Sequence, residues 1–271
     1  MPDILRFTIL GCGSSPGVPR ITGDWGACDP KNPKNRRLRS SMLVERIRTD
    51  GAKTIAVIDT GPDFRQQMVN AGVRRVDAVV YTHPHADHIH GIDDLRGFWL
   101  EHKKLIDIHA DEATSARLRE GFRYCFETPK GSYYPPIVRE NRISHHQTFA
   151  ISGPGGEIRF EPLPQQHGGM ISLGFRIENI GYCSDVSDFP AATAARLTGL
   201  DVLVIDALQH DPHPTHISLG QSLEWIKRLA PKRAITTHMH TPLDYGTVLA
   251  MTPDHVEPGY DGQVFEVPAG A

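Results

Sequence analysis

Short apolar runs, most of them rich in Val and Ile, recur along the whole chain and predict a protein built largely of strands. Polar residues, Gly and Pro separate the runs. Strands are predicted at 4–10, 41–45, 54–59, 77–82, 106–110, 157–163, 172–178, 201–207, 233–238 and 263–267. Ten or more strands indicate a large sheet or more than one sheet.

Helical patterns fall between some of these runs, near 62–71, 91–103, 111–126, 187–198 and 218–230. The last is the best supported. Ser218 and Gln221 form a capping box, and an apolar stripe follows at Leu219, Leu223, Ile226 and Leu229. Strands grouped with helices, and then grouped again, indicate two similar halves packed sheet against sheet with helices outside.

The composition is that of an ordinary globular protein: 271 residues, 39% hydrophobic and 23% charged. The 25 Gly and 21 Pro predict long ordered loops, and the longest are expected at 11–40 and 127–142. No linker-like shift in composition divides the chain, so a single domain over residues 1–271 is predicted.

A net charge of −3 provides no basic field for a polymeric nucleic acid, so such a partner is not expected. No stretch approaches the roughly 18 apolar residues of a membrane span, and the start MPDILRFTILGCG lacks the pattern of a signal peptide. The four cysteines are scattered, so reduced thiols and a cytoplasmic location are expected.

Residues 82–88, with the sequence THPHADH, put four metal-competent side chains on one loop. The loop follows a predicted strand and precedes a helical segment, a place where sites are commonly built. Because residues two apart in an extended segment project to the same side, His83 and His85 can hold one ion. A turn after them lets Asp87 and His88 face a second ion. Solvated loop histidines are the alternative, but their density favours a metal site.

Two catalytic ions need more donors than this loop supplies, so the hypothesis requires remote ligands. Three candidates lie at the end of a predicted strand or just before one. They are His167 in PLPQQHGG, Asp185 in GYCSDVSD and His238 in AITTHMH.

The order HxHxDH, a single His, an Asp and a late His resembles the metallo-β-lactamase-fold hydrolases over nearly the full chain. The phosphodiesterase branch, especially the PhnP-like phosphoribosyl cyclic phosphodiesterases, is similar in GCGSSPGVP, DTGPDFRQQ, THPHADH, SDVSD and PTHISL. The resemblance implies an α/β fold, a four-layer αββα sandwich of two packed mixed sheets with helices outside. It also implies one metal held by His83, His85 and His167, another by Asp87, His88 and His238, and Asp185 bridging them.

Two cations about 3.5 to 4 Å apart would lower the pKa of a shared water from about 15.7 towards about 7 and clamp a phosphorus centre. The metal-bound hydroxide would attack, and a histidine would protonate the leaving alkoxide. His216 is the candidate acid, because it lies two residues before the helix starting near Ser218, and the resemblance implies the same role. The expected catalytic residues are therefore Asp87, Asp185 and His216.

Other residues are expected to support the metals or the substrate. Asp59, at the end of TIAVID, is expected to accept the free N–H of a metal-bound histidine, with a solvated strand-end Asp as the alternative. The candidate substrate contacts are Ser14, Arg39, Ser41 and His213. The glycine-rich loop that contains Ser14 could equally be a simple turn, and the basic run RRLRSS an exposed one.

The resembling phosphodiesterases hold a structural zinc with three closely spaced cysteines and a late histidine. Here the matching segment GDWGACDPKNP has only Cys28, which argues against a structural zinc. Whether Cys28 or His240 contacts any metal stays open.

The prediction is a dinuclear-metal-dependent hydrolase that cleaves a phosphodiester in a small molecule, such as a cyclic ribose phosphate or a nucleotide. One alternative is lactone or thioester hydrolysis at the same site, and another is a non-catalytic metal-dependent carrier of the same fold. Two divalent ions are expected, zinc or manganese, with iron compatible. A homodimer is compatible, although nothing in the sequence marks an interface.

Overall fold

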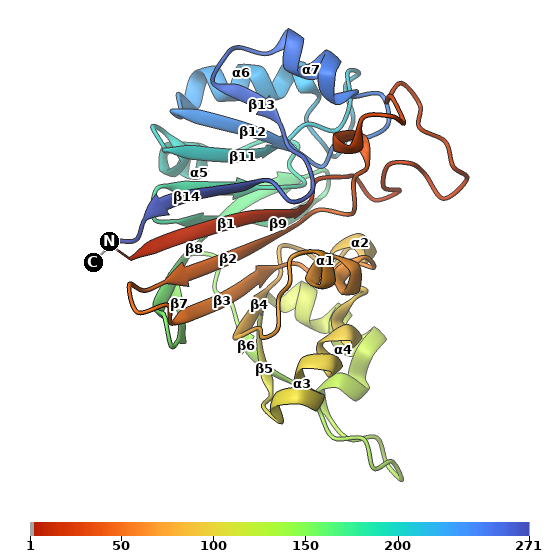
Figure 1. Cartoon of the computed structure of the whole chain (residues 1–271), viewed down its shortest axis with the longest axis vertical. Helices are drawn as coiled ribbons and strands as arrows, with labels where there is room; N and C mark the ends of the chain where they lie inside the picture. Colours follow the sequence, from red (N-terminus) through yellow and green to blue (C-terminus); the bar gives the residue numbers. More distant parts are fainter. Residues whose placement is uncertain (1–2, 271) are drawn as a thin grey trace.

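The computed structural model describes residues 3–270, which form two seven-stranded sheets (Figure 1). The first sheet has the order β14 (Val264–Pro268), β1 (Ile4–Gly11), β2 (Ser41–Ile47), β3 (Lys53–Ile58), β4 (Ala78–Val80), β5 (Ile106–Ala110) and β6 (Val138–Arg142). The second has the order β13 (Val256–Pro258), β12 (Arg233–Thr237), β11 (Val202–Asp206), β10 (Ile180–Cys183), β9 (Met170–Ile177), β8 (Gly156–His167) and β7 (Phe149–Gly153). All ten predicted strands are present.

Each sheet is antiparallel on one side and parallel on the other. Strands β14, β1, β2 and β3 pair antiparallel, and β3 to β6 pair parallel. The second sheet repeats this arrangement, with β7 to β10 antiparallel and β10 to β13 parallel. Strands β4 and β11 are buried at every position, as expected for parallel strands covered on both faces.

Helices cover the outer faces of both sheets (Figure 1). The helices of the structure are η1 (Pro33–Asn35), within the loop between β1 and β2, and α1 (Phe64–Asn70), α2 (Ala86–Ile89), η2 (Ile92–Leu95), α3 (Arg96–His102), α4 (Glu112–Phe126), α5 (Ala191–Leu197), α6 (Leu219–Leu229) and α7 (Tyr245–Met251). The Ser218–Gln221 capping box forms as predicted and starts α6. The four-layer αββα sandwich is confirmed.

Three hydrophobic layers hold this sandwich together. Side chains from both sheets, including Phe7, Val44, Phe160 and Phe175, form the core between the sheets. A second layer lies between the first sheet and α1, α3 and α4, and a third between the second sheet and α5 and α6. Burial of apolar surface in three layers, at about 25 cal/mol per Å², fixes the two sheets relative to each other.

Several short elements escaped the sequence analysis: β6, β7, β10, β13 and α7. The predicted loop 127–142 is therefore shorter, because β6 occupies its last residues. Strands of three to five residues show too little alternation to be recognised alone, and they form because a neighbouring strand offers a complete edge.

The loop between β1 and β2 is fastened to the segment that precedes α7. Arg37 is only 1% exposed, and its guanidinium donates to the carbonyl oxygen of Leu243 at 2.7 Å. Asn35 donates to the Asp244 carboxylate at 2.6 Å and accepts from the backbone N–H of Tyr245 at 2.7 Å. This loop is therefore an ordered part of the fold despite its length.

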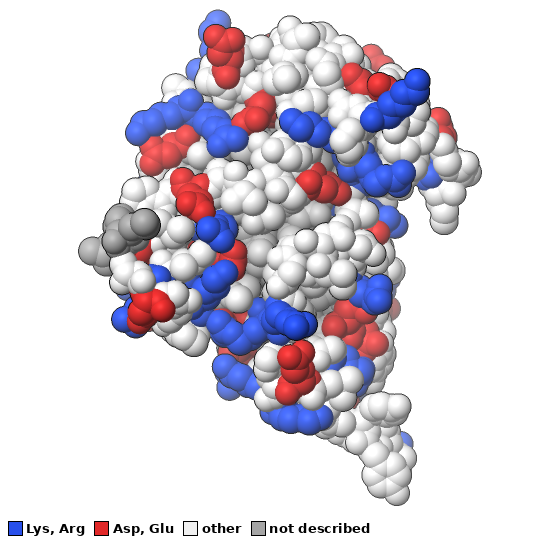
Figure 2. Space-filling view, in the orientation of Figure 1, with Lys and Arg blue, Asp and Glu red and all other residues white. Residues whose placement is uncertain are grey.

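Basic and acidic side chains are mixed over the face drawn in Figure 2. Within residues 3–270, no helix has the length and apolar character that crossing a membrane requires.

A close backbone approach holds the 82–88 loop against the end of β3. A Cβ atom at Gly61 would lie 2.1 Å from the carbonyl oxygen of Asp87, and one at Gly91 would lie 2.2 Å from the carbonyl oxygen of Gly61. Only glycine fits at these two positions without moving the loop.

We therefore expect Gly61→Ala to lower the free energy of unfolding by about 1–3 kcal/mol, because the new methyl group collides with backbone. Gly97→Ala in α3 is the matched control, since its Cβ would meet nothing within 4 Å. Urea unfolding of both variants measures the difference. Equal stabilities would contradict the close packing at Gly61.

Candidate metal centre

The side chains predicted to bind metal follow the ends of strands that meet at one edge of the two sheets. The 82–88 loop follows β4, His167 ends β8, Asp185 lies two residues after β10, and His238 directly follows β12. The structure brings all seven predicted ligands together.

These residues form two groups, each with potential ligand atoms within 4.8 Å of one another. The first consists of His83, His85, His167 and Asp185, and the second of Asp87, His88, Asp185 and His238. Asp185 belongs to both groups. Its Oδ1 lies 3.2 Å from His88 Nε2, and its Oδ2 lies 3.7 Å from His83 Nε2.

Three residues at this edge have left-handed backbone conformations. The φ angles are 63° at Asp59, 53° at Asp185 and 54° at His238. Such angles in residues other than glycine cost of order 1–3 kcal/mol each and persist only where the surroundings enforce them. The turn after each strand aims the side chain at the common centre.

Buried hydrogen bonds orient the ring of His88. Its Nδ1 lies 2.7 Å from Asp59 Oδ2 and donates to that carboxylate, so Nε2 faces the two groups. This Nε2 is buried and has no hydrogen-bond partner among residues 3–270. Burial lowers the pKa of His88, but the charges of Asp185, Asp87 and Asp59 outweigh it and raise the pKa well above its usual value. The surroundings of Nε2 therefore favour a cation.

Hydrogen bonds also orient the rings of His83 and His167. Thr82 Oγ1 donates to Asp59 at 2.8 Å, so it accepts from Nδ1 of His83 at 2.9 Å. His167 Nδ1 donates to the carbonyl oxygen of Thr215 at 2.7 Å. Both rings thus direct an unprotonated Nε2 toward His85 Nδ1, at 3.0 and 3.2 Å.

Burial lowers the pKa of His83 well below its usual value and that of His238 to about 3. Burial would raise the pKa of Asp185, but His238 and His88 beside it lower it well below its usual value. Neutral imidazoles and an ionised carboxylate are the donor set that a divalent cation needs. The residues of both groups therefore fit two such ions.

The centre is buried except on one side. His83, His88, Asp185 and His238 are at most 2% exposed, whereas His85 is exposed. Solvent and any substrate therefore approach from the side of His85.

His216 lies beside both groups. Its Nδ1 donates to Asp206 Oδ2 at 2.7 Å, and its Nε2 lies 3.9 Å from Asp185 Oδ2. The ring stacks on His238 with centroids 4.8 Å apart. Burial opposes protonation of His216, but the hydrogen bond and charge of Asp206 outweigh it and raise its pKa. His216 therefore directs one nitrogen at the centre and binds a carboxylate with the other.

The four residues predicted to contact the substrate lie in different surroundings. Ser14 donates its backbone N–H to the carbonyl oxygen of Met239, the residue after His238, and its side chain hydrogen-bonds His240 at 2.9 Å. Exposed His213 lies 5.4 Å from His216 between ring centroids. One expectation needs correction. Ser41 is fully buried and donates to backbone carbonyls of β3 and Asp59, so no substrate reaches it. Arg39 directs its guanidinium at Asp63, with both carboxylate oxygens at 3.0 Å.

Neither Cys28 nor His240 belongs to a group of potential metal ligands among residues 3–270. Cys28 Sγ donates to the carbonyl oxygens of Thr241 and Leu243 at 3.3 and 3.5 Å. His240 is bonded to Ser14 and Arg20, and burial lowers its pKa.

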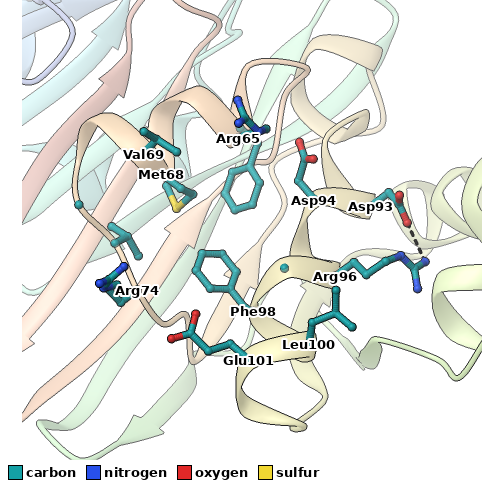
Figure 3. A pocket seen from close by; sticks show the side chains of 14 residues that line it. Arg65, Met68, Val69, Arg74, Asp93, Asp94, Arg96, Phe98, Leu100 and Glu101 are labelled. Carbon is teal, nitrogen blue, oxygen red and sulfur yellow. Dashed lines mark hydrogen bonds and ion pairs between the residues drawn. The ribbon is translucent and has the colours of Figure 1, made fainter.

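An apolar groove of about 660 Å³ lies elsewhere, between α1 and α3 (Figure 3). Met68 and Phe98 face into it, and charged side chains such as Arg65, Arg74 and Glu101 stand around it. None of its lining residues belongs to the metal groups, so the groove is separate from the centre.

Comparison with known proteins agrees with this geometry. The profile of the "Beta-lactamase superfamily domain" matches residues 54–239, a span that contains every residue of both groups. The chain belongs to the β-lactamase superfamily. This superfamily of metallo-hydrolases supports assignment of the chain as a metal-dependent hydrolase with divalent ions.

Within the superfamily, the predicted PhnP-like resemblance is confirmed. A crystal structure of a diphosphatase from the PhnP family superposes with a TM-score of 0.87 at 35% identity and covers 98% of each chain. Zn²⁺-bound PqqB from Methylobacterium extorquens is 18% identical, with a TM-score of 0.70, covering 96% of this chain and 99% of its own. That second likeness concerns the fold alone.

One curated relative is longer than this β-lactamase superfamily chain. It is named octanoyltransferase, from Porphyromonas gingivalis (strain ATCC BAA-308 / W83), and is 31% identical over 264 residues. The match covers 95% of this chain and 51% of the relative, so the chain spans about half of that protein's length.

The sequence analysis missed Asp206 and Thr82, which lie behind the centre and bind its histidines. A signal for Asp206 was present. The strand ending DVLVID repeats the pattern of TIAVID, which ends at Asp59. Both carboxylates directly follow a Val-Ile pair and accept a hydrogen bond from a histidine Nδ1.

We expect Asp59→Asn to weaken binding of zinc about 10- to 100-fold, because the amide no longer accepts from three donors and frees the ring of His88. Competition with a zinc-binding dye measures the affinity. Asp254→Asn, at an exposed position, is the matched control. Equal affinities in the two variants would contradict this role for Asp59.

Proposed function

We propose that the chain, as one domain over residues 1–271, is a metal-dependent hydrolase that cleaves a phosphodiester in a small molecule. The main support is the position of His216, a histidine with a raised pKa that faces the two metal groups and is oriented by a buried carboxylate. The 35% identity to a PhnP-family diphosphatase supports chemistry at phosphorus.

In this proposal, His83, His85 and His167 hold one ion, Asp87, His88 and His238 hold the other, and Asp185 bridges them. When bound, the ions would activate a water molecule for attack and neutralise charge on the phosphoryl oxygens. The chain itself supplies a rigid set of donors, since Asp59, Thr82 and Thr215 fix the ring orientations of three histidines.

His216 supplies the proton for the leaving oxygen. With Nδ1 bonded to Asp206, the other proton of the imidazolium lies on Nε2, the atom that faces the centre. Burial raises the pKa of Asp206 to about 6, although its hydrogen bond to His216 opposes this shift. Proton donation of this kind contributes typically 10² to 10⁴-fold, roughly, to a rate.

A small substrate agrees better with the charge distribution than a polymeric nucleic acid does. The net charge is −3, and acidic side chains interrupt the basic ones in Figure 2. Human tRNase Z, short form, has a TM-score of 0.65 at 17% identity, covering 96% of this chain and 98% of its own, and shares the fold. We therefore propose a nucleotide or a cyclic ribose phosphate as the substrate class.

Hydrolysis of a carbonyl bond at the same centre is the second candidate. The observation that favours it is the curated relative named octanoyltransferase, since transfer of an octanoyl group is acyl chemistry. The half of that relative outside the match can carry the transfer, so phosphodiester hydrolysis remains our first proposal.

We expect metal-stripped protein to be inactive and protein reloaded with zinc or manganese to hydrolyse bis(p-nitrophenyl) phosphate. Asp185→Ala removes the carboxylate shared by both groups, so turnover should fall at least about 100-fold, within the range of a lost metal contribution. A lactone and an octanoyl thioester are assayed in parallel. Turnover of those substrates alone would favour the carbonyl hydrolase, and none at all would favour a carrier.

We expect His216→Ala to slow hydrolysis of a phosphodiester with an alkoxide leaving group by about 10² to 10⁴-fold. The loss should be much smaller with a p-nitrophenolate leaving group, which departs without a proton. Metal content by atomic emission should stay unchanged. His210→Ala, an exposed histidine in the same segment, is the control. Equal losses with both leaving groups would exclude His216 as the acid.

A further inference from the structure

Two loops meet beside the metal centre and are tied together through their backbones. The N–H of Met239 donates to the carbonyl oxygen of Cys12 at 2.8 Å, and the N–H of Ser14 donates to that of Met239 at 3.2 Å. His240 therefore lies next to Ser14, two residues after His238. This contact joins the 11–40 loop to the strand end that carries a proposed ligand.

A chain of side-chain hydrogen bonds continues outward from this contact. Ser14 Oγ lies 2.9 Å from His240 Nδ1, and His240 Nε2 lies 2.7 Å from a terminal nitrogen of Arg20. The other terminal nitrogen of Arg20 donates to Asp24 at 2.9 Å. This series of hydrogen bonds starts at Ser14, which is almost fully buried, and reaches Arg20, whose side chain is 42% exposed.

The donors and acceptors along this chain have one consistent assignment. A guanidinium only donates, so His240 Nε2 accepts from Arg20, and the ring proton lies on Nδ1. Ser14 Oγ accepts that proton, which leaves its own hydroxyl hydrogen available. Arg20 makes two side-chain hydrogen bonds among residues 3–270, so some of its five N–H groups remain for a ligand.

Two other arginines of this loop have different surroundings. The guanidinium of Arg39 binds Asp63, and that of Arg37 is buried against backbone carbonyls. Arg20 differs because it is held from two sides and still partly exposed. A fixed guanidinium with free donors is suited to bind a phosphoryl group.

We propose that Arg20, positioned by Asp24 and His240, binds a second phosphoryl group of the substrate. The inference rests on the proposed function and extends its substrates to diphosphate diesters, in which the bond broken is the anhydride bond between the two phosphorus atoms. One phosphorus would lie at the metal centre, and the next would lie toward Arg20.

For two adenosines joined through a diphosphate, the reaction balances with one water. The water oxygen bonds to one phosphorus, and the bond from that phosphorus to the bridging oxygen breaks. The departing phosphate takes the electron pair and a proton, so two molecules of adenosine monophosphate form. No oxidant or further reactant is needed.

The test compares this dinucleoside diphosphate with bis(p-nitrophenyl) phosphate, using the zinc- or manganese-loaded protein. Arg20→Gln keeps an N–H donor for His240 but loses the charge. We expect its kcat/KM to fall at least about 10-fold more for the diphosphate than for the monophosphate diester, since hydrogen bonds to charged groups have about that effect. Arg20→Lys should lose less, and Arg36→Gln, an exposed arginine of the same loop, should change neither substrate.

Equal losses of Arg20→Gln on both substrates, or none on either, would overturn the assignment of Arg20 while leaving phosphodiester hydrolysis intact. Thermal melting of each variant accompanies the kinetics, and Arg20→Lys decides the question if Arg20→Gln does not fold. Wild-type protein that hydrolyses neither substrate would overturn the proposed function, and this inference with it.

Discussion

The buried carboxylate of Asp185 is the group on which the rest of the centre depends. It belongs to both groups of potential ligands, and only 2% of it is exposed. A charge removed from water in this way is tolerated only beside compensating positive charge. The neighbouring His88, whose pKa is raised, provides part of that compensation, and its unpartnered Nε2 favours a cation beside Asp185.

The sandwich makes this concentration of polar groups possible. Parallel strands of both sheets end at one edge, while three apolar layers behind them fix the strand ends in place. The left-handed turns at Asp59, Asp185 and His238 follow directly from that support, because an unsupported chain would relax them. The packing energy of the three apolar layers thus maintains the strained backbone at the edge that carries the centre.

Each sheet contributes a carboxylate that orients a histidine of the centre. Asp59 of the first sheet orients His88, and Asp206 of the second orients His216, each through a 2.7 Å bond to Nδ1. Each bond turns the Nε2 of its ring toward the centre. In the proposed function, the same side-chain pair serves ligand binding in one half and proton donation in the other. Beyond His216, the Arg20 chain extends the centre toward solvent.

From the sequence alone, alternating apolar runs established the ten longer strands and five helical segments, and the spacing in THPHADH indicated a metal site. These patterns are local, so they can be recognised without a fold. The remote candidates His167, Asp185 and His238 could be named from strand ends, but only the tertiary structure brought them within reach of the loop. Only the tertiary structure showed that Arg20 binds His240, that Arg39 binds Asp63 and that Ser41 is buried. The partners of a side chain depend on packing between segments far apart in sequence.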